Sequence, residues 1–431
     1  MTNSVTKSSI APSDNSTLQR QEPSYPSAIK GYSTTLILLL IYCLSLLDRN
    51  IISALAPAIQ SDLNVSDTDM GFIYGGAFAI AYGLGAIPFG WAVDRYPRRA
   101  VIGFGVLCWS AATVFCGLAR TYTQLLIPRA FVGLGEAAII PASYSLLPDM
   151  FPPSRLSFPF SIFSLGAKVG HSFAFLIVSL LTVWIIPTAT VDIGPLWSGS
   201  GWQLILIIVG LGGAPLALLT LFVYEPARVR PVTRRNMAAE YMEYLQFVRR
   251  NLRFFVPHHT ATAIMMAVAT GLISWLPTLM FRDFGWEAGK ASFWIGICLL
   301  VGPVGGMPLA GMLADRLHQR GVAGAQLRVL SGALLVGGII APFSYMTDNG
   351  FLCLLGIGIF LAVTACFTSL AATSMLLVVP DFYRGRGTTV QFLVCGMVGT
   401  TVGPLLVGLM TDGLFGAPMS TAVGFQAGVA E

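Results

Sequence analysis

Six ionisable side chains lie inside long apolar stretches of this sequence, where a charge without compensation is costly. The six are Asp48, Arg49, Arg129, Glu136, Lys168 and His171. All of them belong to the first half of the chain, and we find none at comparable depth in the second half. Side chains at such positions usually line the path of a substrate or of protons. The set combines cations that can bind an anion with carboxylates that can take up a proton.

The spacing of these residues predicts which of them share a helix face. Glu136 follows Arg129 by seven residues, which is two helical turns, and Lys168 and His171 form an i, i+3 pair. With a rise of about 1.5 Å per residue, Arg129 is expected at the same depth in the membrane as Asp48 and Arg49. The other three residues are expected near the middle of the membrane.

Each residue also has a structural interpretation. Asp48 is either functional or one half of a structural ion pair with Arg49 or Arg129. Glu136 has no partner at its own depth except Lys168 or His171. This favours a carboxylate that carries protons, because protonation removes its burial cost. The ring of His171 could instead donate a hydrogen bond to a backbone carbonyl.

The elements that must carry these residues are membrane-spanning helices. Hydrophobic residues form 55% of the 431 residues, and only 10% are charged, whereas soluble domains carry roughly 25% charged residues. A span needs about 20 mostly apolar residues. We predict eleven spans, at 32–57, 68–92, 99–119, 122–148, 156–184, 202–224, 258–281, 289–314, 327–346, 351–379 and 386–411. The chain is therefore predicted to be an all-α, multi-pass protein of the plasma membrane, which in a bacterium is the inner membrane.

Basic residues are distributed unevenly over the predicted loops. One set of loops is rich in arginine, and the alternate set holds only Arg120, Arg282 and Lys290. By the positive-inside rule, the arginine-rich loops and the N-terminus are predicted to be cytoplasmic. The net charge of +5 belongs to these loops and indicates no nucleic-acid partner.

Two segments of the sequence repeat each other. The second span ends in PFGWAVDR at 88–95, and the eighth ends in PLAGMLADR at 308–316. The pair Pro148 and Asp149 is likewise echoed by Pro380 and Asp381. These repeats predict two similar halves, an architecture of secondary transporters. We expect a disordered tail at 1–31, halves at 32–224 and 258–431, and a linker at 225–257 that contains an amphipathic helix.

The segment GWAVDRYPRR at 90–99 resembles the signature loop of the major facilitator superfamily, with Pro97 where that pattern usually has glycine. The resemblance implies two six-helix halves, which a loop latches together at the cytoplasmic side in the outward-open state. The gating residues that it implies are Asp94, Arg95, Arg98 and Arg99, with Asp315 and Arg316 in the repeat. The family has twelve spans, so the absence of a twelfth is a departure. The apolar tail at 415–431 is too short to cross.

Asp48 and Arg49, together with RAFVGLGEA at 129–137, resemble the Spinster branch of this superfamily. That branch exports lysophospholipids and sphingoid phosphates and is thought to be proton-linked. From their charge and depth in the membrane, we predict substrate binding at four cations and proton coupling at two acids. The cations are Arg49, Arg129, Lys168 and His171, and the acids are Glu136 and Asp48. Gly133 and Gly135 would let the charged face of the fourth span pack near the first.

The leading hypothesis is a proton-coupled transporter of an anionic amphipath that works as a monomer by alternating access, with substrate, protons and membrane lipids as its partners. Apolar residues of the second half could face an acyl chain, namely Met265, Met266, Phe281, Phe360 and Phe367. The alternative is a symporter of a hydrophilic organic anion, because sugar-acid symporters carry a similar arginine. A lipid enzyme ranks lower, since only His258 and His259 are neighbouring histidines. A channel or receptor also ranks lower, because channels rarely need the duplicated loop. The seven cysteines lack metal-ligand spacing, and no cofactor is predicted.

Overall fold

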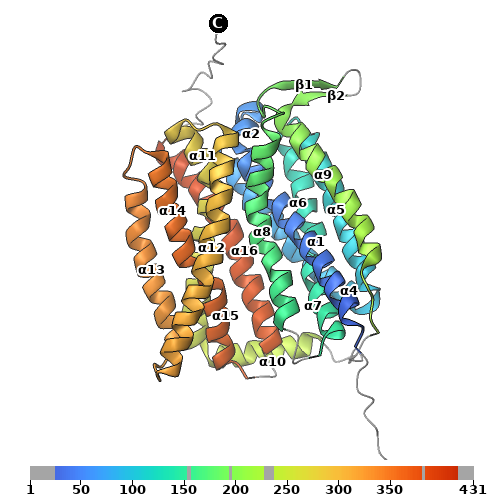
Figure 1. The fold of residues 1–431 in the computed structure, drawn as a ribbon, viewed down its shortest axis with the longest axis vertical. Helices are drawn as coiled ribbons and strands as arrows, with labels where there is room; N and C mark the ends of the chain where they lie inside the picture. Colours follow the sequence, from blue (N-terminus) through green and yellow to red (C-terminus); the bar gives the residue numbers. More distant parts are fainter. Residues whose placement is uncertain (1–24, 153–156, 194–196, 228–236, 381–383, 416–431) are drawn as a thin grey trace, which may run out of the picture.

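The computed structural model describes residues 25–152, 157–193, 197–227, 237–380 and 384–415. Helices α1 to α9 form one side of the bundle, and α11 to α16 form the other (Figure 1). The helix α10 lies across one end, which we call the α10 end. A small β-hairpin marks the opposite end, which we call the hairpin end. The structured chain begins at the α10 end, where the arginine-rich loops were predicted to gather.

The first half consists of nine α-helices and two short irregular turns. Their bounds are α1 Ala28–Ala54, α2 Ala56–Leu63, α3 Asp67–Gly71, the π-helical turn η1 Phe72–Gly76, α4 Ala77–Arg95, α5 Arg98–Gly117, α6 Tyr122–Glu136, α7 Ile139–Met150, α8 Ser157–Leu181, α9 Gly201–Leu219 and the 3₁₀ turn η3 Thr220–Phe222. The linker helix α10 spans Met237–Arg250. The second half contains α11 Leu252–Phe284, α12 Ala288–Gln319, α13 Ala325–Ser344, α14 Gly350–Thr364, α15 Phe367–Val378 and α16 Arg384–Phe415.

The helices coincide with the predicted spans. In the described part of the chain, nine helical segments are long and apolar enough to cross a membrane. Two shorter apolar helices, Ala288–Pro303 and Gly350–Thr364, fall on the eighth and tenth predicted spans. The prediction of a helical membrane fold is confirmed. The tail at 416–431 and the predicted disordered tail up to residue 24 lie outside the described residues.

Two predicted spans are interrupted rather than continuous, at matching places in the two halves. The fourth span breaks between α6 and α7, and the tenth breaks between α14 and α15. Pro141 accounts for the first break, because it has no N–H to donate to the carbonyl of Ala137. The break comes directly after Glu136, so this carboxylate lies at the end of a helix inside the bundle.

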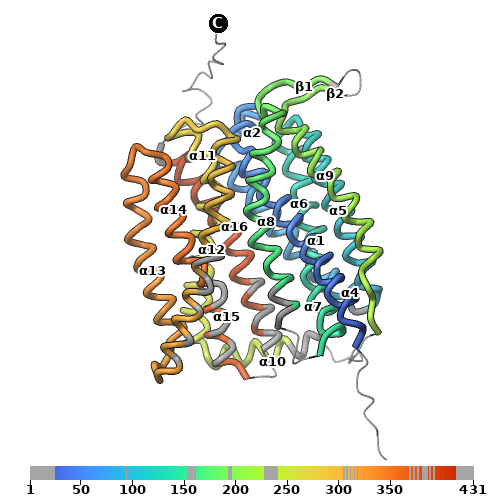
Figure 2. Tube along the Cα trace, viewed as in Figure 1, coloured from blue at the N-terminus to red at the C-terminus, as the bar shows by residue number. Residues whose placement is uncertain are grey.

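The packing of the helices also repeats between the halves. In the first half α1 packs mainly on α8 and α4 on α6, and in the second half α11 packs on α16 and α12 on α14. Glycine allows close approach of these helices, since a Cβ at Gly170 of α8 would meet the Cys43 carbonyl oxygen of α1 at 2.4 Å. The halves meet where α8 contacts α12 and where α16 contacts α3, η1 and α4. Figure 2 traces α8 and α12 side by side near the centre.

The only strands among the described residues form the hairpin, β1 Thr190–Ile193 and β2 Trp197–Ser200, which pair antiparallel. Asp62 anchors the hairpin to α2. Its carboxylate accepts hydrogen bonds from the Ser200 hydroxyl at 2.7 Å and from the Trp202 indole N–H at 2.8 Å. The hairpin is the one departure from a purely helical fold in this part of the chain.

Candidate functional site

An ion pair between α1 and α6 forms the centre of the site. The Arg49 guanidinium donates to Glu136 Oε2 from Nη2 at 2.6 Å and from Nε at 3.2 Å. The Glu136 side chain is fully buried, and the Arg49 side chain is 25% exposed. The prediction that only Lys168 or His171 could partner Glu136 was wrong. The helical rise of about 1.5 Å per residue placed Glu136 two turns away from the layer of Arg49. The arginine side chain is long enough to cover that distance.

Aromatic rings surround the two arginines. The Arg49 guanidinium carbon lies 4.3 Å from the centroid of Phe78 and 5.4 Å from that of Tyr82, and the Arg129 carbon lies 5.1 Å from Phe78. These distances are within the range of cation–π attraction. Gly133 lets α6 approach the backbone of α4 at Phe78, because a Cβ there would meet the Phe78 carbonyl oxygen at 2.4 Å.

The two glycines of α6 therefore do not serve the contact that was predicted for them. Gly133 packs on α4, and a Cβ at Gly135 would meet the Trp109 backbone nitrogen of α5 at 2.7 Å. Neither glycine packs on α1. The charged face of α6 does reach α1, but through long side chains rather than through close backbone approach.

Arg129 is only 1% exposed and binds the backbone of α1. Its guanidinium donates to the carbonyl oxygens of Arg49 at 2.5 Å and Asp48 at 3.4 Å. Its Nε has no hydrogen-bond partner in the described part of the chain. In this conformation Arg129 fixes α1 against α6 and is not open to a ligand.

Asp48 is 3% exposed, and its carboxylate accepts a hydrogen bond from the hydroxyl of Thr113 on α5. No ion pair links Asp48 to another described residue. The predicted pair with Arg49 or Arg129 is therefore not formed, since Glu136 takes Arg49 and Arg129 binds carbonyl groups. Asp48 is a buried carboxylate that a single hydroxyl donor supports.

Lys168 and His171 lie on α8, beside α1 and α12. His171 Nδ1 lies 2.7 Å from the carbonyl oxygen of Ala167. This contact is the hydrogen bond to a backbone carbonyl that the structural interpretation of His171 predicted. Lys168 is half-buried, and its amine forms no ion pair or hydrogen bond with any residue the structure describes. Lys168 is therefore a cation in the bundle that is available to an anion.

A second polar cluster, which we call the outer lock, joins the two halves at the hairpin end. Arg282 of α11 donates to both carboxylate oxygens of Asp67 on α3, each at 2.6 Å. Asp412 of α16 accepts from the Thr68 backbone N–H at 2.8 Å and from its hydroxyl at 2.5 Å. Asp412 also accepts from the Asp67 backbone N–H at 3.3 Å, and Arg282 donates to Gln60 of α2 at 3.4 Å. The halves are thus fastened at the hairpin end.

The predicted gating residues lie near the α10 end. Arg98 is fully buried within the first half, where it binds Asp149 and donates from Nε to Glu225 at 2.7 Å. Arg95 stacks on Trp91 at 4.3 Å. Arg99 and Arg316 are exposed. The side chains of Asp94 and Asp315 lie outside the described part, so the latch stays a prediction.

Sequence reasoning missed several residues of these clusters. Thr113, Phe78 and Tyr82 were not singled out, because neutral residues in an apolar stretch carry no charge signal. Arg282 did carry a signal, since it is one of few basic residues on the arginine-poor side. The apolar wall predicted for the second half is partly wrong, because Phe360 is buried beside Gly337 of α13.

The sequence pattern of the Major Facilitator Superfamily matches residues 38–425, so the chain belongs to this family. It is a multi-pass membrane transporter and not an enzyme. It is 26% identical to an MFS-type efflux pump of Mycolicibacterium smegmatis, over 89% of this chain and 85% of the pump. It is also 26% identical to a D-galactonate transporter of Escherichia coli, over 90% of this chain and 91% of that protein.

A solved structure places the chain near one branch of the family. A bacterial homolog of the human lysosomal transporter Spinster, in an inward-facing conformation, is similar with a TM-score of 0.76 and 25% identity. The similarity covers 90% of this chain and 84% of that protein. The resemblance to the Spinster branch is confirmed, whereas the substrate is not fixed by these relatives.

Proposed function

We propose that this protein transports a small anionic amphipath, of the lysophospholipid or sphingoid phosphate type, in a proton-coupled cycle of alternating access. The ion pair between Arg49 and Glu136, beside the unpaired Lys168, carries the proposal. The anion binds to Arg49 and Lys168. Arg129 holds α1 in place for this binding, although the sequence suggested that it touches the anion itself.

Coupling follows from competition for one guanidinium. Ionised Glu136 occupies Arg49, and a proton on Glu136 removes the ion pair and frees Arg49 for the anion. Proton and anion therefore favour each other's binding, because a coupling free energy between two sites is reciprocal. Asp48 is the second acid that can hold a proton, since burial without an ion pair makes its charged form costly.

Alternating access rests on the outer lock. The lock closes the hairpin end, and the bacterial Spinster homolog to which this chain is similar is inward-facing. Loss of the lock and closure of the predicted latch at Asp94 would give the outward-open state.

A hydrophilic organic anion is the second candidate substrate. The match to the D-galactonate transporter over nine-tenths of both chains supports it. The same two cations would bind a sugar-acid carboxylate. A thermal-shift screen of the purified protein with lysophospholipids, a sphingoid phosphate and galactonate distinguishes the two classes.

The decisive experiment is Glu136→Gln in proteoliposomes, with whichever ligand the screen identifies. The amide mimics the protonated acid, so we expect binding and counterflow to persist and accumulation driven by a pH gradient to vanish. Ligand affinity should rise with falling pH in the wild type and become independent of pH in the variant. Glu287→Gln, at an exposed acid, is the control. Full gradient-driven transport by Glu136→Gln would remove Glu136 from coupling.

A further inference from the structure

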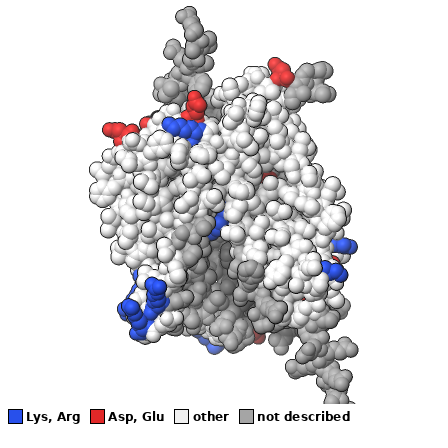
Figure 3. All heavy atoms as spheres, in the orientation of Figure 1, with Lys and Arg blue, Asp and Glu red and all other residues white. Residues whose placement is uncertain are grey.

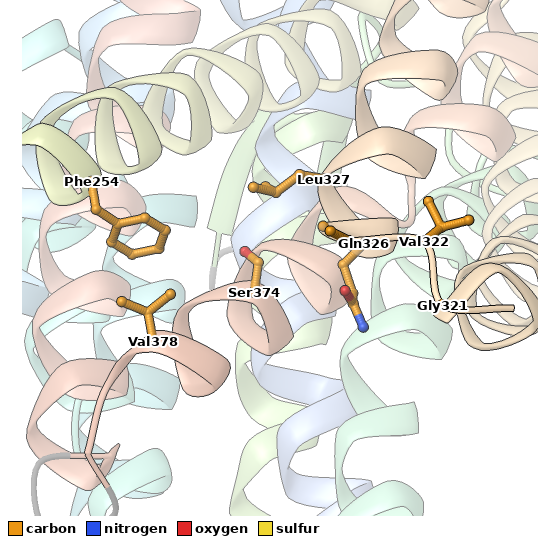
Figure 4. Close-up of a pocket in the computed structure, with 9 residues that line it drawn as sticks. Phe254, Gly321, Val322, Gln326, Leu327, Ser374 and Val378 are labelled. Carbon is orange, nitrogen blue, oxygen red and sulfur yellow. The ribbon is translucent and has the colours of Figure 1, made fainter. Parts of the chain in front are cut away.

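The second half contains a cavity of about 350 Å³ at the α10 end, away from the central site. It lies between the start of α11, the turn after α12, the start of α13 and the end of α15. Figure 4 shows Phe254 and Val378 on one side, with Leu327, Gln326 and Val322 on the other and Ser374 between them. Four of these six side chains are apolar. The volume falls within the range of small-molecule sites, roughly 300–1,000 Å³.

The polar residues of the cavity differ in how their hydrogen bonds are satisfied. The Ser374 hydroxyl donates to the Ala371 carbonyl at 2.8 Å and lies 3.1 Å from Nε2 of His258. Gln326 is 8% exposed, and its amide forms no hydrogen bond with a residue the structure describes. The Gln326 amide lines the cavity. A ligand that brings an ester or hydroxyl oxygen to Gln326 would give this amide a hydrogen-bond partner.

Basic side chains border the cavity. Arg320 and Arg328 flank the turn and first helical residues that line it, and Arg253 precedes Phe254. All three are exposed. Figure 3 shows basic side chains gathered over the α10 end of α12 and α13, at the lower left of the view. The predicted orientation puts this end at the cytoplasmic leaflet, where anionic lipids attract basic residues.

One side of α13 is apolar and open in the described part of the chain. The side chains of Leu335, Ile339 and Phe343 on this helix are 62–70% exposed.

We propose that the cavity binds an anionic phospholipid of the surrounding membrane. One acyl chain lies against Phe254, Leu327 and Val378, the glycerol ester oxygens reach Gln326, and the phosphate lies near Arg320 and Arg328. The site is separate from the central site. The proposal does not depend on what the transporter carries.

Native mass spectrometry of the full chain, delipidated in detergent and titrated with phosphatidylglycerol or phosphatidylcholine of equal chain length, tests it. Two arginines near one phosphate should give phosphatidylglycerol a preference of roughly tenfold. Arg320→Gln with Arg328→Gln should abolish that preference and leave weak retention of both lipids. Leu327→Trp, which fills the cavity, should lower the retention of both.

Two controls separate this site from other lipid contacts. Arg249→Gln with Arg250→Gln neutralises exposed arginines of α10 at the same end and should keep the preference. Arg49→Gln removes the central cation and should keep it as well. Equal retention of both lipids by the wild type, or a preference that survives Arg320→Gln with Arg328→Gln, overturns the proposal. So does full retention by Leu327→Trp, which would place the lipid elsewhere or leave the cavity to a protein segment.

Discussion

The central acids differ in the contacts that hold them. Glu136 uses one carboxylate oxygen for Arg49, and its Oε1 has no partner among described residues. Asp48 depends on one hydroxyl, that of Thr113. A buried oxygen without a donor is a place where a proton binds at little cost, since protonation neutralises the acid. Protonation of either acid therefore changes what Arg49 or α5 can contact.

Thr113 is expected to shift the pH profile of transport through Asp48, the second acid, while Glu136 remains the coupling site. Thr113→Val keeps the shape and removes the donor to Asp48, so the charged acid loses a hydrogen bond. Hydrogen bonds to charged groups contribute about 1.5–3 kcal/mol, which corresponds to a rise of the transport midpoint by about one pH unit or more. Thr113→Ser retains the donor and should restore the wild-type profile. A Thr113→Val profile that overlays the wild type would exclude this role.

Lys168 is expected to contribute directly to anion affinity. Lys168→Gln removes the unpaired cation, and loss of a charged hydrogen bond of about 1.5–3 kcal/mol corresponds to a roughly 10- to 100-fold weaker Kd. Isothermal titration with the anionic ligand and with an uncharged analogue separates this effect from misfolding, because only the anion should be affected. Lys290→Gln at the hairpin end is the matched control. Equal losses for both ligands would make Lys168 structural.

Much of the central site was predictable from charge alone, and its pairing was not. An ionisable residue in an apolar stretch stands out in a sequence, which is why all six charged residues were found. The partner of Glu136 depends on the reach of Arg49 and on the depth at which α6 ends. Both depend on how helices tilt and break. A depth calculated from residue number and helical rise takes no account of either.

At the scale of elements, the helices followed from apolar runs of adequate length, and their interruptions did not. Pro141 carries a sequence signal for the break after Glu136, whereas the matching break after Thr364 of α14 has no proline. The outer lock joins α3, α11 and α16 from distant parts of the chain. These three elements meet only in the folded molecule, so their contacts cannot be predicted from the residues that neighbour them in the sequence.

The outer lock is expected to hold the hairpin end shut. Arg282→Gln leaves Asp67 buried without its cation, a change that costs about 3–5 kcal/mol in buried pairs. The closed arrangement loses this stability, so the population should shift toward an open hairpin end. Double electron–electron resonance between labels at Ser61 and Asp348, on a cysteine-free background, measures the shift. Arg120→Gln, at an exposed arginine near the same end, should leave the distances unchanged. An unchanged distribution in Arg282→Gln would contradict the lock.

At the scale of the whole molecule, alternating access is a balance between two fastenings. The outer lock is predicted to stabilise the conformation that is closed at the hairpin end. The duplicated loop, with Asp94 in the first half, is predicted to stabilise the opposite conformation. A change in either fastening shifts one two-state equilibrium, because a population responds only to the free-energy difference between its states.

Opposite variants should therefore cancel. Asp94→Asn weakens the latch and should lengthen the distances across the α10 end, whereas Asp67→Asn weakens the lock and should shorten them. The two sites lie at opposite ends of α3 to α4, and the effects of distant sites usually add within about 0.3–0.5 kcal/mol. The double variant is expected to return close to the wild-type distance distribution, measured by the same resonance method at both ends. Its stability should be lower than that of the wild type, since both conformations have lost a contact. If Asp94→Asn leaves the distances unchanged while Asp67→Asn shifts them, the lock alone sets the equilibrium and the loop is only an interfacial turn.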